Sequence, residues 1–272
     1  MPGWERQLQM RRQMITTYKC SSHQAGFSLV EMAIVLLIVA LLLGGLLPTL
    51  SGQIEQRRVS ETSKQLDEIK DALIGYAIIN GRLPCPATIT PTNSNGTESF
   101  VSGGNASNGN CANFYNGYVP AATLGLAGTD SSGFAVDAWS NRIHYAVTSW
   151  SSTSPAVNNV FTTMNGMSTI GISNLSPNLL VCSTATGITS SSCATGTSLT
   201  SNGVPAVIYS TGKNGAYGGT GIDEAANLDA SRTFVSHTPV PSSVANGEFD
   251  DLVTWLSPNT LFNRMVAAGK LP

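Results

Sequence analysis

Near the start of the chain, residues 27–47 form an apolar run in which Glu31 is the one ionisable side chain. As a helix these 21 residues measure about 31 Å, which matches a bilayer hydrocarbon core of roughly 30 Å. The preceding residues carry four basic side chains and one acidic side chain, a bias that keeps the N-terminal side of such a helix in the cytoplasm. The pattern therefore predicts a single membrane-spanning helix, with the rest of the chain outside the cytoplasm.

After this run the apolar positions recur at intervals of three, four or seven residues, with charged residues on the other faces. The apolar positions are Val59, Leu66, Ile69, Leu73 and Tyr76. We therefore expect an amphipathic helix over residues 48–80 that continues the apolar run and ends at Gly81. A cluster of helix-weakening residues predicts a bend or local unwinding between the two halves. It comprises Gly44, Gly45, Pro48 and Gly52.

Residues 81–272 have a different pattern, with short β-forming segments between stretches rich in Gly, Ser, Thr and Asn. The segments "RIHYAVTSW", "NLLVCST" and "PAVIYST" predict an antiparallel sheet laid against the amphipathic half of the helix. A short second helix is expected in "NTLFNRMVAAGKLP", with Asn259 or Thr260 as cap and Gly269 at its end. The polar stretch from Thr92 to Asn110 predicts an exposed, mobile loop. The fold class is thus α+β, with one long N-terminal helix, a β-rich globular domain and long loops.

Charge and composition exclude several functions. Beyond residue 26 the chain has 10 basic and 15 acidic residues, so no basic patch is available for nucleic acid. The "GK" at Gly212 and Lys213 does not fit a phosphate-binding loop. Only His144 and His237 remain as histidines after residue 26, and no G-x-S-x-G elbow accompanies them, so we expect no enzymatic activity.

Four cysteines follow residue 26, namely Cys85, Cys111, Cys182 and Cys193. An even number agrees with two disulfides in an oxidising compartment. Four cysteines allow three pairings. We favour Cys85 with Cys111 and Cys182 with Cys193, because each pair closes a loop of polar, weakly structured sequence.

"GFSLVE", residues 26–31, together with Pro48, resembles the class III signal of type IV prepilins and type II secretion pseudopilins. The resemblance implies that residues 1–26 are a leader, cut by prepilin peptidase between Gly26 and Phe27, with methylation of the new Phe27 amine. It also implies that Glu31 pairs with the Phe27 amine of a neighbouring subunit in a filament. The alternatives are cleavage by ordinary signal peptidase and a simple single-pass anchor with Glu31 near the interface. Translation from Met10 or Met14 would shorten the long leader.

Two later segments also resemble the family. "DAWSNRIHY", residues 137–145, resembles the D-x-W-G-N segment of major pseudopilins, with Ser140 where glycine is usual; we interpret it as a core anchor and turn. "YSTGKNGAYGGTGIDEAANLD" resembles their calcium loop, and Ca²⁺ needs six to eight oxygen ligands. Asp223 and Asp229 are the best candidate ligands, followed by Glu224 and Asn227. The acidic residues of "EFDDLVTWLSP" either cap a helix or join this loop; they are Glu248, Asp250 and Asp251.

Together these observations predict a structural subunit, a minor or atypical pilin of a type IV pilus-like filament assembled through its N-terminal helix. Its partners would be prepilin peptidase, other pilin subunits, the inner-membrane assembly machinery and, before assembly, the membrane itself. The globular domain would be periplasmic and then exposed on a pilus or pseudopilus. The first alternative is a pseudopilin of a type II secretion system. A further alternative is a membrane-anchored binding or adhesin domain, in which the helix is only a tether.

Overall fold

The structure, a computed structural model, describes residues 26–89, 95–219 and 221–272, with the side chains of residues 43–50 and 217 left out. Apart from Gly26, the expected leader lies outside the described residues. Contacts within the chain define two compact units that meet between Gly52 and Gln53. The second half of the long helix therefore belongs to the same unit as the globular domain.

Helix α1 (Leu29–Asn80) is continuous, so the chain is not unwound at the glycines and proline between its halves. Within the second unit its buried side chains recur every three or four residues, as a stripe facing one core requires. They are Thr62, Leu66, Ile69, Leu73, Ile74 and Ala77. Val59 and Tyr76, which the apolar pattern also assigned to this stripe, are half-buried at its margins.

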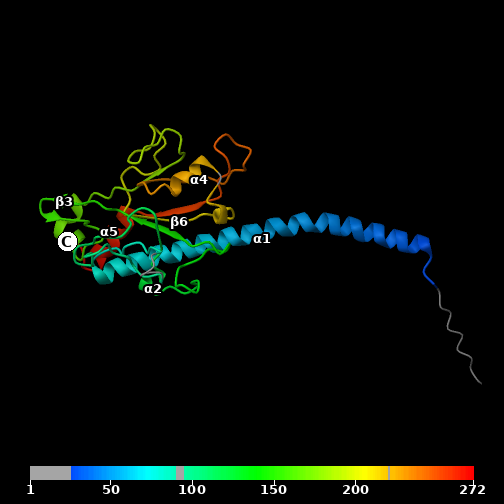
Figure 1. Cartoon of the computed structure of the whole chain (residues 1–272), viewed down its shortest axis with the longest axis horizontal. Coiled ribbons are helices and arrows are strands. Elements are labelled where there is room, and N and C mark those ends of the chain that lie inside the picture. Colours follow the sequence, from blue (N-terminus) through cyan, green and yellow to red (C-terminus); the bar gives the residue numbers. More distant parts are fainter. Residues whose placement is uncertain (1–25, 90–94, 220) are drawn as a thin grey trace, which may run out of the picture. The chain divides into compact units, whose positions relative to one another are not determined.

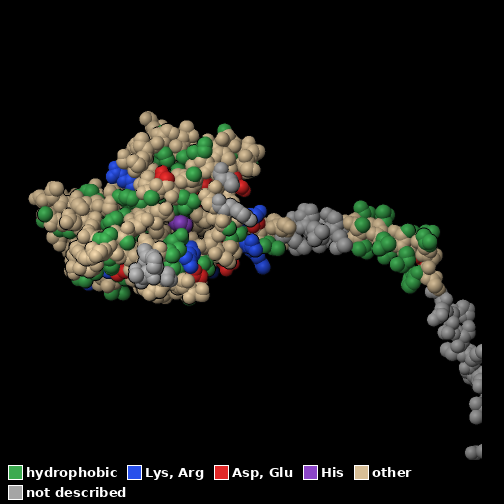
Figure 2. All heavy atoms as spheres, in the orientation of Figure 1, with side chains coloured by type: hydrophobic (Ala, Val, Ile, Leu, Met, Phe, Trp, Pro, Cys, Tyr) green, Lys and Arg blue, Asp and Glu red, His purple; other side chains and the backbone are tan. Residues whose placement is uncertain are grey.

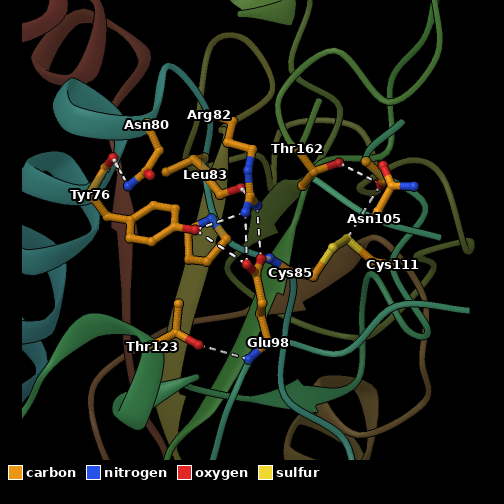
Figure 3. A network of polar contacts seen from close by, with 12 residues as sticks. Tyr76, Asn80, Arg82, Leu83, Cys85, Glu98, Asn105, Cys111, Thr123 and Thr162 are labelled. Carbon is orange, nitrogen blue, oxygen red and sulfur yellow. Dashed lines mark hydrogen bonds and ion pairs between the residues drawn. A yellow bond between two sulfur atoms is a disulfide. The ribbon is translucent and has the colours of Figure 1, made fainter. Parts of the chain in front are cut away.

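The C-terminal end of α1 is fixed by local chemistry. Gly81 has φ +68°, and its N–H donates to Ala77 O at 2.8 Å, which is the left-handed helix stop expected of this glycine. A Cβ at this position would lie 2.5 Å from Asn165 Oδ1. Directly after the turn, the Arg82 guanidinium pairs with the Glu98 carboxylate (Figure 3). The helix end is therefore attached to the loop that contains Glu98.

The main sheet has four strands in the order β1-β2-β6-β8, and every neighbouring pair is antiparallel. His144 pairs with both Tyr118 and Tyr209, and Ile208 pairs with Thr254. The strands are β1 (Gly117–Tyr118), β2 (His144–Val147), β6 (Ala206–Ser210) and β8 (Leu252–Leu256). The α+β fold with an antiparallel sheet, predicted from the sequence, is thus confirmed.

Both faces of this sheet are covered, which explains why every residue of β6 is buried. Successive strand residues point to opposite faces. Ile208 joins the core formed with α1 and α5 (Pro258–Ala267), whereas Val207 joins a second core on the other face. In Figure 1, α4 (Ile222–Asn227) lies on the opposite side of β6 from the cyan part of α1. A sheet laid against one helix was expected; the second layer was not.

The second layer includes a parallel pair, β5 (Leu180–Cys182) and β7 (Thr233–Val235). The remaining elements are β3 (Ser152–Thr153), β4 (Ala156–Val157), α2 (Ala121–Leu124), α3 (Gly166–Ile170) and the 3-10 helices η1 (Ile172–Asn174) and η2 (Gly215–Tyr217).

Two local expectations need correction. The N-cap residue of helix α5 is Ser257, two residues before Asn259, and its side chain makes no capping hydrogen bond. The helix begins at Pro258 because proline with its fixed φ suits the first helical position. The loop expected to be exposed over residues 92–110 is only partly exposed to solvent. Its first residues lie outside the described ranges, but Ser99 is buried and Phe100 forms a β-bridge with Cys111.

Candidate functional site

The processing motif contains a helix cap. Glu31 N–H donates to Ser28 Oγ at 3.2 Å, and Ser28 N–H donates to Glu31 Oε2 at 2.9 Å. This reciprocal pair is a capping box, in which a Ser at the N-cap and a Glu three residues later satisfy two of the free N–H groups at a helix start. The sequence interpretation assigned Glu31 to pairing between subunits or, alternatively, to the membrane interface, and did not include a capping role. The S-x-x-E spacing of residues 28–31 was the signal for this second role.

Around this cap the helix presents apolar side chains to the outside. Gly26 is exposed, Phe27 is 82% exposed and Leu29 is 87% exposed. Figure 2 shows hydrophobic side chains gathered along this described start of the helix. The exposed members are Phe27, Leu29, Val30, Met32, Ile34, Val35, Leu36, Leu37, Ile38, Val39, Leu41 and Leu42. An apolar surface of this extent marks a site covered by a partner or a membrane.

Within the described residues, no helix combines the length and the hydropathy needed for a membrane span. The span expected over residues 27–47 includes residues 43–47, whose side chains lie outside the described set.

The four cysteines after residue 26 form two disulfides, Cys85–Cys111 and Cys182–Cys193, in the pairing favoured from the sequence. The first closes a segment with a sequence separation of 26, and both of its cysteines are buried in the main core. The second closes a separation of 11 within the layer that contains β5.

The candidate calcium ligands point in different directions. Asp223 accepts hydrogen bonds from Ala185 N–H and from Asn246 Nδ2, and lies 3.2 Å from His237 Nε2. Burial alone would raise the pKa of Asp223, but these hydrogen bonds, led by that of Ala185, hold it below its ordinary value. Asp229 is exposed and accepts from Ser231 N–H at 2.8 Å. Neither belongs to the group of carboxylates that the structure brings together.

That group consists of Glu224, Asp250 and Asp251, each with a carboxylate oxygen within 4.8 Å of the others. Glu224 lies on α4, and the two aspartates directly precede β8. Asn227, another candidate ligand, holds one member of the group in place, because its Nδ2 donates a hydrogen bond to Asp251 Oδ2 at 2.7 Å. The acidic residues at 250 and 251 thus join the glycine-rich loop, as one of the two sequence interpretations expected.

Burial and neighbouring charge change the protonation of the two aspartates. Burial, reinforced by the charge of Glu224, raises the pKa of Asp250 to about 6. Burial, reinforced by Glu224 and Asp250, raises the pKa of Asp251 to about 8. Carboxyl groups that share a site cannot all ionise cheaply unless a cation compensates them.

The donor set fits a hard cation. Asn214 Nδ2 donates to both Glu224 carboxylate oxygens, at 3.0 and 3.1 Å, so the Asn214 amide lies beside the acidic cluster. Asn214 Oδ1 and Asp250 Oδ1 are buried and have no hydrogen-bond partner among the described residues. Clustered carboxylate and amide oxygens are the ligands that Ca²⁺ prefers. A cavity of about 510 Å³, lined in part by Asp250, Asp251 and Trp139, lies beside the carboxylates.

The segment of residues 137–141 is tied to the same loop. Asp137 accepts hydrogen bonds from Trp139 N–H, Asn141 N–H and Ser210 Oγ, so it organises a turn. Asn141 Nδ2 donates to Gly212 O at 2.6 Å. Ser140, at the position where glycine is usual, has φ +69°. The turn therefore requires a left-handed backbone conformation at residue 140, and serine adopts that conformation at a cost in free energy.

Both histidines of the domain pack against aromatic rings. His144 stacks on Tyr209 with ring centroids 4.7 Å apart, and burial lowers its pKa to about 4. His237 stacks on Phe249 with ring centroids 3.9 Å apart and contacts Asp223.

Comparison with known proteins identifies the N-terminal segment. The family model described as the prokaryotic N-terminal methylation motif matches residues 21–47. The match includes the capping residues Ser28 and Glu31 and the apolar run behind them, and it does not extend into the globular domain. No curated protein and no solved structure gives a significant match.

Proposed function

Because the chain carries the class III signal of type IV pilins and pseudopilins, we propose that it is a structural subunit, a minor or atypical pilin, of a type IV pilus-like filament. The observation that carries this proposal is a methylation motif that includes the capped start of an apolar helix. The motif implies processing by prepilin peptidase and assembly with other subunits. The chain acts by assembly and not by catalysis.

In a filament, neighbouring subunits supply a partner for the charges and a cover for the apolar side chains at the start of α1. Cleavage after Gly26 converts the Phe27 nitrogen into a charged amine at the end of an apolar segment. In the filament, Glu31 of one subunit pairs with this amine of its neighbour, which compensates both charges in an apolar environment. The exposed side chains of Phe27 to Leu42 are then covered by equivalent helices. Before assembly the same segment is held in the inner membrane, with the disulfide-containing domain in the periplasm.

Ca²⁺ bound by Glu224, Asp250 and Asp251, with Asn214 as a further oxygen ligand, is part of this proposal. The support is the set of crowded carboxylates together with the buried, unpartnered oxygens of Asn214 and Asp250. This ligand set replaces Asp223, Asp229 and Asn227, whose polar groups are directed to other partners. A cation here would join α4, β8 and the loop between β6 and η2 in one cross-link.

A pseudopilin of a type II secretion system is the second candidate. Its specific support is the connection between the turn at residues 137–141 and the glycine-rich acidic loop, made by Asn141 and Gly212. Both segments resemble those of major pseudopilins. The two candidates share the same processing and the same helix, and they differ in the machine that extracts the subunit.

The test of the class is mass spectrometry of the intact protein and of its N-terminal peptide, after expression with and without a prepilin peptidase. We expect a mature form that begins at methylated Phe27 and forms only with the peptidase. A catalytically inactive peptidase is the matched control. A leader that persists with active peptidase, or a cut elsewhere, would refute the assignment as a pilin-like subunit and leave a tethered extracytoplasmic domain.

A further inference from the structure

A second cavity lies at the opposite end of β8 from the acidic cluster and has a volume of about 670 Å³. It lies where β8 passes into α5, and the loops of residues 172–177 and 199–204 complete its walls. Ligand-binding cavities in proteins commonly have volumes of about 300–1,000 Å³. The size therefore suits a small organic molecule and exceeds what an ion needs.

The lining of this cavity is polar but uncharged. The described residues that line it include no Asp, Glu, Lys, Arg or His. Amides are contributed by Asn202, Asn259 and Asn263, and each amide both donates and accepts hydrogen bonds. Asn259 and Asn263 are four residues apart on α5, so they share one face of that helix. Such a wall offers no charge partner to a phosphate, carboxylate or amine.

Two aromatic side chains line the wall: Phe262, which is buried in the main core, and Trp255. Trp255 lies on β8, an edge strand of the main sheet, and is half-buried with its body packed against the second core. Packing on that side fixes the indole without covering it completely. An aromatic ring beside amide groups suits a molecule that has an apolar face and hydroxyl groups at its edge.

An unpaired hydroxyl supports the same conclusion. Thr200 lines this cavity, and its Oγ1 is buried and has no hydrogen-bond partner among the described residues. Buried polar atoms in proteins are nearly always paired, so an orphan at a cavity wall indicates a partner supplied from outside the chain. A ligand hydroxyl provides both a donor and an acceptor for it.

We propose that this cavity binds a neutral carbohydrate, with a sugar ring stacked on Trp255 and its hydroxyls hydrogen-bonded to Asn259, Asn263 and Thr200. A pyranose combines an apolar C–H face with a rim of hydroxyls, which matches the partly exposed indole of Trp255 and the amide groups of the wall. A charged sugar would lose its hydration without gaining an ion pair. The inference does not depend on filament assembly.

The test uses the full-length protein in a zwitterionic detergent without a sugar headgroup. Saturation-transfer NMR and isothermal titration would measure binding of four neutral disaccharides: maltose, lactose, sucrose and di-N-acetylchitobiose. An uronic-acid disaccharide of the same size is the charged control. We expect saturable binding of at least one neutral probe and at least tenfold weaker binding of the charged one.

Variants locate the site. The double variant Asn259→Ala/Asn263→Ala should weaken binding of that disaccharide at least tenfold. Thr260→Ala, an exposed substitution on the same helix outside the cavity lining, is the matched control and should leave binding unchanged. Trp255→Phe keeps an aromatic ring for packing and should weaken binding less than the amide variant does. Absence of saturable binding by all four neutral probes, equal binding of the charged sugar, or equal binding by the double variant would each overturn the proposal.

Discussion

Arg82 and Glu98 form a two-point ion pair, with Nη1 to Oε2 at 2.8 Å and Nη2 to Oε1 at 2.7 Å (Figure 3). The Arg82 side chain is only 4% exposed. Glu98 Oε2 also accepts from Cys85 N–H, and Arg82 Nη2 donates to Tyr76 Oη. This network joins the last turn of α1 to the loop that the first disulfide closes, so two distant parts of the chain are held by one buried charge pair.

Replacement of Glu98 should therefore be severe. Glu98→Ala leaves the Arg82 charge buried without a partner, and we expect a loss of about 3–5 kcal/mol in the free energy of unfolding, measured by urea denaturation. The double variant Arg82→Met/Glu98→Leu removes both charges and should lose much less than the single variant. If the double variant were as unstable as the sum of its two single variants, the pair would contribute no coupling energy, contrary to this interpretation.

The two roles of Glu31 can be separated by mutation. Glu31→Gln keeps a side chain that can complete the capping box but removes the charge, whereas Ser28→Ala removes the capping hydroxyl and keeps the charge. We expect both variants to be cut by prepilin peptidase. Glu31→Gln should enter filaments poorly, as measured by the ratio of sheared to cell-associated subunit. Ser28→Ala should assemble nearly as well as wild type. The reverse order would make the cap, not the charge, the assembly determinant.

The acidic cluster predicts an unusual pH dependence. The raised pKa of Asp251, about 8, means that the folded protein binds more protons than the unfolded chain above the ordinary aspartate pKa. Its contribution to stability is therefore complete at low pH and is lost as the pH rises through about 8. In EDTA, the melting temperature of wild type should fall relative to that of Asp251→Asn as the pH rises from 5 to 8.

Calcium should reverse this loss. Added Ca²⁺ should raise the melting temperature of wild type at pH 8 and have little effect on Asp251→Asn. Asp229→Asn, an exposed acid outside the cluster, is the matched control and should behave as wild type. His144, whose lowered pKa destabilises the fold in acid, is the same in all three proteins and cancels in the differences. An equal response to Ca²⁺ in Asp251→Asn would exclude Asp251 as a ligand.

Ser140→Gly should stabilise the domain. Ser140 is exposed and has φ +69°, a conformation that costs an L-residue roughly 1–2 kcal/mol and glycine almost nothing. After the greater backbone entropy of glycine in the unfolded chain is subtracted, a gain of about 0.5–1 kcal/mol remains. Thermal unfolding would measure it. Ser242→Gly is the control at an exposed position without positive φ, and it should destabilise slightly. A loss of stability in Ser140→Gly would show that the serine makes a compensating contact.

The parts of the fold with a local sequence signal were predictable. The apolar run and the three- and four-residue spacing of Leu66, Ile69 and Leu73 fixed the helix, and Gly81 fixed its end. Strands β2, β5 and β6 lie within the segments that β-propensity marked. Strand β7 was missed, because its three residues stand alone between polar stretches, whereas the three residues of β5 belong to a longer apolar segment.

Polar contacts between residues far apart in the chain could not be predicted, because no local sequence pattern marks them. Glu98 lies in a stretch almost free of core-forming side chains, and only its distant partner Arg82 gives it a buried role. The same holds for the acidic cluster of Glu224, Asp250 and Asp251. Glu224 and Asp223 are neighbours in sequence, but the short helix α4 directs one carboxylate to Asp250 and the other to Ala185 and His237. The glycine-rich segment contains Glu224, and only the tertiary fold brings it beside Asp250 and Asp251.

The disulfide between Cys85 and Cys111 has a mechanical consequence. A pulling force that enters the domain along α1 reaches Cys85 five residues after the helix ends. The covalent bridge carries tension directly to Cys111 and bypasses the segment between them, whose separation of 26 residues corresponds to about 90 Å of extended chain. That length cannot be drawn out under load, so a subunit under tension stays short at this point even if its non-covalent contacts yield.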